Sequence, residues 1–584
     1  MLTNNCTHRM LNRFFLSLIT ILFLVSACKT QSVVLKPVVT TAPQKSINAK
    51  KAVVACAHPI AAKVGVEIMK QGGNAIDASV AVQLALAVVY PRAGNIGGGG
   101  FLVYRSGDGK EINTLDFRER APSGASRDMY LDNKGNVITD KSTRGPLAAG
   151  VPGTIEGCYR MFEKYSKLKN WKKLVQPAID LANTGFTITE SEAKRLNEMK
   201  TTLKKFSSGS SDFIKVDGKI WQTGDILIQK DLAKVLMHVR DKGIAGFYEG
   251  ETADLIVAEM KKGGGIITLA DLKNYTSVWR KPLIGQYRGY DIIGMPPPSS
   301  GGIALMQLLS ISEDKKLNTF PFHSPESMHL IVESERRVYA DRAEYLGDPE
   351  FFKVPQNQLL DKNYLRTRMM DFDPNKATSS KQIKAGSIAA QSEQTTHISI
   401  VDAQGNATSI TTTLNDNYGC RTVVAGAGFI LNNEMDDFSV KPGVPNMYGA
   451  IGGEANSIQP LKHPLSSMTP TIVAKNGKLF MVVGTPGGTT IITSVFQVIT
   501  NVIDYKMNMS DAVQAPRFHS QWMPDVVMFE KKGLVGDVKE QLEKKGHKIM
   551  ERSYIGLVEA ILVNSDGTLQ GAADGRSDDD AEGF

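Results

Sequence analysis

Residues 55–91 carry the apolar pattern of two consecutive helices. The segment is apolar at most positions and is interrupted by a glycine pair at 72–73. We expect one helix that stops at these glycines and a second helix that is capped by Asn74 and ends before Pro91. Because the second stretch is apolar on nearly all sides, it predicts a buried helix.

Four glycines at 97–100 follow and lead into the strand-like stretch FLVYRS. A phosphate-binding loop has the opposite order: a strand, then glycines, then the helix whose N-terminal amides hold the anion. There is also no GxxxxGK motif. We therefore expect a tight bend with close backbone approach rather than a nucleotide site.

The middle of the chain, about 155–375, mixes helical and strand patterns. Residues 230–250 and 326–347 have the spacing of amphipathic helices. Residues 287–305 predict a strand that enters a loop of proline, serine and glycine. Residues 373–394 contain few large apolar side chains and are expected to be flexible.

Beyond residue 394 the pattern changes to strands. Apolar or alternating runs occupy 396–402, 407–415, 471–475 and 479–488, with hairpin-like turns at DAQGNA and KNGK. Late helices are expected at 493–505 and 539–549. The whole chain predicts a layered α/β protein with helices outside two packed sheets.

Composition and charge favour an ordinary globular protein. The chain is 42% hydrophobic and 22% charged, which argues against disorder. Its length of 584 residues is enough for several domains. The formal net charge is +8, but the basic residues are scattered and no nucleic-acid motif is present, so we expect a solvated basic surface. From Thr395 onward 15 basic and 21 acidic residues give −6, against +14 before it. Two such parts would attract each other after a cut.

The N-terminus has the pattern of an export signal. A flank with two arginines precedes an apolar run at 14–25 that is too short to span a bilayer. The run ends in Ser-Ala-Cys, which resembles the lipobox of bacterial lipoproteins; an ordinary signal with a coincidental cysteine is the alternative. We expect a signal peptide at 1–27, a lipid on Cys28, a tether at 28–50, and a periplasmic or cell-surface location.

The remaining cysteines do not indicate a structural site. Cys56, Cys158 and Cys420 are widely spaced, and the chain has no CxxC pair. We expect neither a disulfide framework nor a structural metal.

Thr395 becomes chemically interesting if the chain is cut in front of it. A threonine inside a chain has no base of its own, whereas an N-terminal threonine carries an α-amine with a reference pKa of about 7.7–8.0. This amine can accept the hydroxyl proton, which activates the nucleophile. His397 shares the face of Thr395 in a strand and is a rival base. Because such neighbours run nearly parallel, we expect His397 instead to be packed or hydrogen-bonded in the sheet.

Several long motifs together resemble the gamma-glutamyltransferases, also called gamma-glutamyl transpeptidases. They are GGNAIDASVAVQLALAVVYPRAGNIGGGGF, LDFRERAP, TTHISIVD, LNNEMDDFSVKPGVPNMYG, PLSSMTPTIV, GTPGG and APRFHSQW. The match covers about residues 51–584. It implies the αββα sandwich of the N-terminal-nucleophile hydrolases. It also implies a precursor that cuts itself into a large subunit, 51–394, and a small subunit, 395–584, which stay together as a heterodimer.

The resemblance also assigns the catalytic residues. The cleaved bond would join Gln394 to Thr395, with Thr395 as the nucleophile. Thr413 matches a threonine whose hydroxyl approaches the amine and hydroxyl of the nucleophile. Gly487 and Gly488 match the glycines whose N–H groups form an oxyanion hole. No cofactor is implied, because acyl transfer through an ester needs only a nucleophile, a base and oxyanion donors.

A γ-glutamyl group presents an α-carboxylate and an α-ammonium side by side, so its pocket needs both signs of charge. The resemblance assigns residues to both ends and a lid tyrosine over them: Arg118, Ser466 and Ser467 to the carboxylate, Asn415, Glu434 and Asp437 to the ammonium, and Tyr448 to the lid. Surface salt bridges of the charged residues and strand-end caps made by the serines are the structural alternatives.

Two departures from the family pattern stand out. Cys420 and Arg421 occupy positions where smaller residues are usual, which leaves the local shape near the pocket open. Gly575 stands where a proline is common, which we expect to be a surface variation.

The implied enzyme cleaves the γ-glutamyl amide of glutathione and related compounds through a threonyl ester and passes the acyl group to water, an amino acid or a peptide. An acylase for glutaryl or cephalosporin side chains would use the same nucleophile without needing an ammonium site. A non-catalytic binding lipoprotein of the same fold would remain an uncut chain. The expected partners are small-molecule substrates, the second subunit and a membrane reached through the lipid, and not nucleic acid.

Overall fold

The helices near the start form where the apolar pattern predicts them. The computed structural model describes residues 36–383, 394–442, 444, 453–531 and 533–584. Helix α2 spans Pro59–Lys70, and α3 spans Ala75–Val89 with every residue buried. Asn74 and Asp77 cap α3 reciprocally, each side chain accepting a hydrogen bond from the other's backbone N–H.

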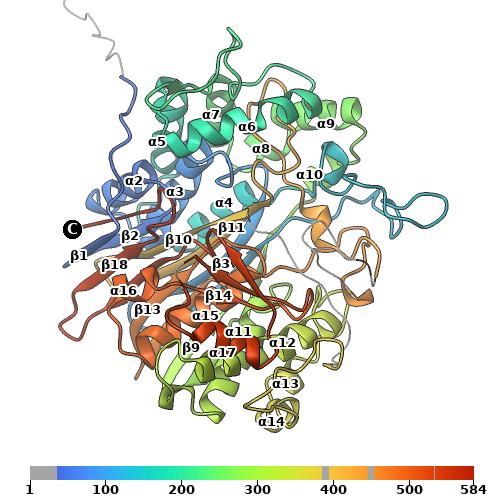
Figure 1. The fold of residues 1–584 in the computed structure, drawn as a ribbon. Coiled ribbons are helices and arrows are strands. Elements are labelled where there is room, and N and C mark those ends of the chain that lie inside the picture. Colours follow the sequence, from blue (N-terminus) through green and yellow to red (C-terminus); the bar gives the residue numbers. More distant parts are fainter. Residues whose placement is uncertain (1–35, 384–393, 443, 445–452, 532) are drawn as a thin grey trace, which may run out of the picture. The chain divides into compact units, whose positions relative to one another are not determined.

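Two seven-stranded antiparallel sheets form the centre of the unit that runs from Pro37 to Phe584 (Figure 1). The first sheet has the order β19 (Asp580–Gly583), β2 (Val53–Cys56), β10 (Gln394–Val401), β11 (Ala407–Asn415), β3 (Gly99–Arg105), β4 (Ile112–Phe117) and β7 (Val278–Arg280). The second has the order β1 (Ser46–Ala49), β18 (Leu569–Ala573), β17 (Glu559–Val563), β13 (Lys478–Gly484), β12 (Thr471–Lys475), β9 (Tyr290–Gly294) and β8 (Leu283–Tyr287). Smaller sheets join β14 (Phe518–His519), β15 (Val527–Glu530) and β16 (Ile549–Arg552), and β5 (Phe186–Thr187) with β6 (Ile226–Leu227).

A helical layer covers the outer face of each sheet. One apolar core joins the first sheet to α2, α3, α4 (Thr154–Tyr165), α5 (Trp171–Thr184) and α7 (Lys230–Lys242). A second core joins the other sheet to α11 (Gly301–Asp314), α12 (Pro325–Tyr345), α15 (Thr490–Ile503) and α16 (Met509–Gln514). The shorter or peripheral helices are α6 (Glu190–Phe206), α8 (Ala245–Tyr248), α9 (Glu251–Gly263), α10 (Leu269–Lys273), α13 (Gln356–Leu359), α14 (Lys362–Arg368) and α17 (Val538–Lys544). Figure 1 shows the two layers on opposite sides of the sheets, which confirms the predicted αββα sandwich.

The two sheets pack closely enough for side chains of one to reach the backbone of the other. Ser409 of β11 donates to the Val483 carbonyl of β13 at 3.2 Å, and Ser399 of β10 donates to the Glu559 carbonyl of β17 at 3.0 Å. A Cβ placed on Gly484 would lie 2.2 Å from the His397 ring. The end of β13 therefore lies directly against β10.

Helix α12 is not amphipathic, contrary to the prediction for residues 326–347. It is buried without interruption from Ser327 to Ala343, charged residues included. The charges are neutralised inside the protein: Glu333 accepts hydrogen bonds from Arg336 and Arg337, each at 2.7 Å. The charged positions of this helix therefore form buried ion pairs and do not face solvent.

The described part of the expected tether at 28–50 belongs to the fold, contrary to the prediction. Val38 pairs with Phe186, and β1 pairs along Ser46–Ala49 with β18, so the chain is part of the fold from Pro37 onward. A short strand with few apolar residues was not recognisable because its partner, β18, lies more than 500 residues away.

The segment predicted to be flexible is also partly fixed. Its described part, 373–383, is held by hydrogen bonds to the last third of the chain. Ala377 N donates to the Lys545 carbonyl at 2.7 Å, Ser380 N donates to Asp525 at 3.0 Å, and Trp522 Nε1 donates to the Ser380 carbonyl at 2.8 Å. The bonds use backbone atoms of 373–383, which composition does not reveal. Residues 384–393 lie outside the described residues.

Candidate active site

Thr395 lies at the beginning of β10, directly opposite Thr413 of β11. The register shifts between Gln394 and Thr395, so the ladder is irregular at the predicted cut. Thr395 is buried, and the Thr413 hydroxyl accepts a hydrogen bond from Asn415 N at 2.7 Å. The structure thus places the predicted nucleophile and its predicted threonine partner at paired positions on adjacent strands.

The glycine cluster at 97–100 allows its own backbone to approach Thr413 closely. A Cβ on Gly98 would lie 2.0 Å from the Thr413 carbonyl oxygen, so no larger residue fits there. Asn95, a residue that the sequence did not single out, donates to the same carbonyl at 3.0 Å and accepts from Gly98 N at 3.1 Å. The expectation of close backbone approach is confirmed, and the cluster shapes the end of β11.

The predicted oxyanion-hole glycines lie between β13 and α15. Gly487 and Gly488 have φ angles of +139° and +59°, which favour glycine. Among the hydrogen bonds of the described residues, neither N–H has an acceptor. They precede the first turn of α15, where the helix dipole favours negative charge. This loop can receive a developing oxyanion.

His397 has the structural role that the strand pattern predicts. Its ring is buried between the sheets, with Nδ1 2.9 Å from the Thr411 hydroxyl and Nε2 3.0 Å from the Ser399 hydroxyl. Burial lowers the pKa of His397 to about 3. A neutral ring whose two nitrogens both contact hydroxyls inside the sheet is packed and hydrogen-bonded, as expected.

Arg118 follows β4 and lies among three buried carboxyl groups. Its guanidinium forms ion pairs with Glu434 at 2.7 Å, with Glu119 at 3.3 Å, and with Asp437. Burial raises the pKa of Glu434 well above its ordinary value and that of Glu119 to about 7, although the positive charge of Arg118 opposes both shifts. The surface salt bridge considered for Arg118 and Glu434 is wrong, because both side chains are inaccessible to solvent. Glu119 was missed; its only sequence signal was its place beside Arg118.

The two predicted serines lie on a turn that Arg118 also contacts. Its side chain donates weakly, at 3.4 Å, to the carbonyls of Pro464 and Leu465, just before the serines. The Ser466 hydroxyl accepts from Met468 N at 3.2 Å, and the Ser467 hydroxyl accepts from Arg342 at 2.9 Å. Within the described chain neither hydroxyl donates to another atom. Both O–H groups therefore remain available to an acceptor such as a carboxylate.

Asn415 lies at the end of β11, close to the acidic residues. Its φ is +71°, an uncommon conformation for a non-glycine residue, and its amide donates to the Asn433 carbonyl at 2.9 Å. Asn433 directly precedes the 3-10 turn Glu434–Asp437. The structure therefore joins Asn415, Glu434 and Asp437 around one end of the site and the serines around the other, with Arg118 between them.

The gamma-glutamyltranspeptidase family model matches residues 61–584. The chain belongs to the gamma-glutamyltranspeptidase family. It is 46% identical over 535 residues to the glutathione hydrolase proenzyme of Escherichia coli (strain K12), covering 91% of this chain and 92% of that protein. It is 48% identical over 527 residues to the glutathione hydrolase proenzyme of Pseudomonas sp. (strain A14), covering 90% and 91%. The crystal structure of a cephalosporin acylase from Bacillus halodurans superposes with a TM-score of 0.79 at 25% identity, covering 95% of this chain and 99% of that one.

Three of the residues predicted from the sequence are not placed in full. Tyr448, the predicted lid residue, and Cys28, the predicted lipidation site, lie outside the described residues, and only the backbone of Gln394 is described. Their predicted roles remain predictions.

The departures from the gamma-glutamyltranspeptidase pattern have simple local effects. Arg421 has a positive φ of +66° and pairs with Asp416 at 2.7 Å, next to Asn415. The Cys420 thiol is buried, and burial raises its pKa, which disfavours the reactive thiolate form. Gly575 is exposed, as expected of a surface variation.

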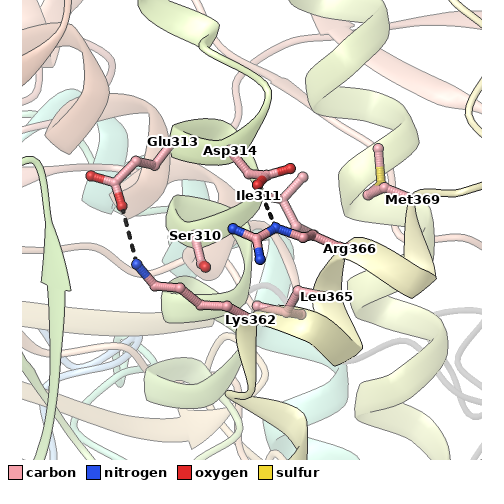
Figure 2. A pocket seen from close by; sticks show the side chains of 8 residues that line it. All are labelled: Ser310, Ile311, Glu313, Asp314, Lys362, Leu365, Arg366 and Met369. Atoms are coloured by element: carbon pink, nitrogen blue, oxygen red, sulfur yellow. Dashed lines mark hydrogen bonds and ion pairs between the residues drawn. The ribbon is translucent and has the colours of Figure 1, made fainter.

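Two other features lie apart from the candidate active site. Figure 2 shows a hollow between α11 and α14, crossed by ion pairs from Lys362 to Glu313 and from Arg366 to Asp314. It contains none of the predicted site residues. His329, Glu333 and His547 form a group whose atoms could surround a metal ion. Because two arginines already neutralise Glu333, this group does not indicate a cation site.

Proposed function

We propose that this gamma-glutamyltranspeptidase cuts itself between Gln394 and Thr395 and then cleaves γ-glutamyl amides such as glutathione. One observation carries the proposal: Thr395 lies opposite Thr413 near the start of β10, and the end of β13, which leads to Gly487 and Gly488, packs against β10 at His397. The N–H groups of these two glycines have no acceptor among the described residues. The relatives whose printed names are glutathione hydrolase proenzyme support both parts of it.

The reaction needs only groups of this chain. The new α-amine of Thr395 takes the proton of its own hydroxyl, and the oxygen attacks the γ-carbonyl carbon. The N–H groups of Gly487 and Gly488 stabilise the tetrahedral oxyanion. The amide nitrogen then leaves with that proton, which gives a threonyl ester. Water or an amine attacks the ester and restores the Thr395 hydroxyl.

The charges of the site suit the two ends of a γ-glutamyl group. Three buried carboxyl groups surround the single guanidinium of Arg118, and burial raises the pKa of Glu434 and Glu119. A substrate ammonium beside Glu434 and Asp437 would add a second positive charge and favour the ionised form of Glu434. The hydroxyls of Ser466 and Ser467 together with Arg118 would bind the α-carboxylate.

The direct test is the variant Thr395→Ala. We expect it to remain one uncut chain and to release no product from glutathione. The wild type should give a small fragment whose N-terminal sequence begins Thr-Thr-His. A mutant that still splits and hydrolyses, or an active wild type that is a single chain, contradicts the proposal. An uncut but ligand-binding wild type would indicate the non-catalytic binding protein instead.

An acylase activity is the second candidate, because the cephalosporin acylase of Bacillus halodurans has the same fold. The buried acids at the ammonium end favour the γ-glutamyl substrate, since a glutaryl group has no ammonium. Turnover of γ-glutamyl and glutaryl p-nitroanilides decides between them. We expect the γ-glutamyl compound to be preferred by at least about tenfold, the value of one charge-assisted hydrogen bond.

We also propose that the enzyme is exported and anchored by a lipid on Cys28. The support is the sequence at 9–28 alone. No helix among the described residues is long and apolar enough to cross a membrane. Incorporation of labelled palmitate in the producing cell should be lost in Cys28→Ser while γ-glutamyl turnover persists. Equal labelling of both proteins would rule out Cys28 as the lipidated residue.

A further inference from the structure

Arg342 of α12 contacts the turn that carries the two serines. Its side chain is 2% exposed and donates from Nη2 to the Ser467 hydroxyl at 2.9 Å and from Nε to the Ser300 hydroxyl at 2.7 Å. Burial lowers the pKa of Arg342 to about 10, so the guanidinium is still charged at neutral pH. The sequence motifs that indicate the family do not include Arg342.

Ser300 extends this contact to the second serine. Its hydroxyl donates to the Ser466 carbonyl at 2.6 Å, and its backbone N–H donates to the same oxygen at 2.7 Å. Ser466 N in turn donates to the Pro298 carbonyl at 3.1 Å. The Pro-Pro-Pro-Ser-Ser-Gly-Gly loop and α12 therefore hold the serine turn at atoms other than those that Arg118 contacts.

The contact with Arg342 fixes which way the Ser467 hydroxyl can act. A serine hydroxyl has one proton to donate and two lone pairs. An arginine has only donors, so it occupies a lone pair of Ser467 and cannot accept its proton. The proton must point elsewhere, and the charge on the guanidinium strengthens the hydroxyl as a donor.

We propose that Arg342 is a positioning residue for recognition of the substrate α-carboxylate: it holds Ser467 as a hydrogen-bond donor and, through Ser300, fixes Ser466. Arg342 itself does not touch the substrate. This inference rests on the proposed function, because it assigns the serines to a carboxylate.

The test compares three p-nitroanilides that differ only at the α-carbon. The γ-glutamyl compound has both charged groups, the glutaryl compound lacks the ammonium, and the 4-aminobutanoyl compound lacks the carboxylate. In Arg342→Gln we expect kcat/KM to fall about tenfold or more for the first two compounds, mainly through KM, and to change less than twofold for the third. Arg342→Lys, which keeps the charge and a donor, should recover part of the loss.

A purely structural role would lower kcat/KM for all three compounds by the same factor, and that result would overturn the proposal. Self-cleavage on a denaturing gel shows whether the variant folds. If Arg342→Gln does not fold, Ser300→Ala is the second variant, because it removes the hydroxyl that joins Arg342 to the Ser466 carbonyl. It should lower kcat/KM a few-fold for the two carboxylate-bearing compounds and leave the third unchanged. An equal effect on all three compounds, or none, would also overturn the proposal. A wild type that cleaves the glutaryl compound but not the γ-glutamyl one would refute the proposed function, while the comparison of carboxylate-bearing and carboxylate-free anilides still decides the role of Arg342.

Discussion

Arg118 is the residue on which both ends of the candidate site depend. It pairs with Glu434 and Asp437 and also contacts the carbonyls before the serines. Its spacing from these residues in the sequence gives no sign of this, since Glu434 lies more than 300 positions away. The residue type predicted a carboxylate partner, but only the fold shows that its present partners are acids of the protein.

We expect Arg118→Ala to lower kcat/KM for γ-glutamyl p-nitroanilide by about 10- to 100-fold, because hydrogen bonds to charged groups contribute about 1.5–3 kcal/mol. Self-cleavage should persist, since no ion pair or side-chain hydrogen bond among the described residues joins Thr395 to Arg118. Initial rates and a denaturing gel measure the two effects. Arg127→Ala, which removes a half-exposed pair with Glu454, is the matched control and should keep full activity. An uncut Arg118→Ala protein would count against a role confined to substrate binding.

Gly488 offers a second test at this scale. With φ at +59°, an alanine there costs about 1–2 kcal/mol of backbone strain and displaces an N–H of the oxyanion loop. We expect kcat to fall about 10²- to 10³-fold in Gly488→Ala. Gly536→Ala is the control, because Gly536 has a similar φ of +65° and open space around its Cα. Equal kcat values in the two variants would rule out a special role for Gly488.

Helix α12 shows how an element can have the right position and the wrong environment. The apolar spacing predicted a helix at 326–347, and α12 lies there. Its charged residues looked solvent-facing because sequence alone does not show which charges pair. Burial between the second sheet and the last third of the chain instead places Glu333 between Arg336 and Arg337.

Glu333→Gln should therefore destabilise the protein by about 1.5–3 kcal/mol at pH 7, the value of hydrogen bonds to a charged group, since two buried arginines lose their shared partner but keep Asp525 and Asp371. Burial alone would raise the pKa of Glu333, but the hydrogen bond from Arg337 and the charge of Arg336 bring it below its ordinary value. The stabilisation by Glu333 is thus present above the ordinary glutamate pKa of about 4.3. It is lost as the pH falls through the pKa of Glu333 in the folded protein, which is lower. Urea unfolding midpoints at pH 7 and pH 3 measure it.

The exposed Glu326, in the first turn of the same helix, provides the control. Glu326→Gln should change the midpoint little at either pH. A Glu333→Gln midpoint equal to that of the wild type at pH 7 would mean that the ion pairs contribute nothing net.

At the scale of the whole molecule, the strands of the two predicted subunits are interleaved. In the first sheet β2, from the part before the cut, lies between β19 and β10, from the part after it. In the second sheet β18, from after the cut, separates β1 from β17, and β12 pairs with β9. Hydrogen-bonded ladders and two shared cores therefore join the fragments, in addition to the opposite charges.

We expect the cleaved protein to remain one particle in 1 M NaCl. At that ionic strength the screening length is about 3 Å, so attraction between fragments of opposite net charge would be largely lost. Size-exclusion chromatography should give a single peak near the 63.6 kDa of the whole chain, less any removed signal, with both fragments in it on a denaturing gel. Separation of the fragments in salt would show that charge holds them. Separation of the fragments only in denaturant would show that the shared sheets and cores hold them together.

The sequence by itself determined the local features. These are the capped, buried helix α3, the strands β10 and β11, the need for glycine at 97–100, and a threonine whose chemistry depends on a free amine. Each rests on periodicity or on the properties of one residue type. The motifs of the sequence also indicated the family.

The tertiary structure alone decided which distant groups meet. It paired β1 with β18, fixed 373–383 by backbone hydrogen bonds, buried the charges of α12, and brought Arg342 into contact with Ser467. These outcomes depend on contacts between residues far apart in the chain, and neither composition nor spacing records such contacts.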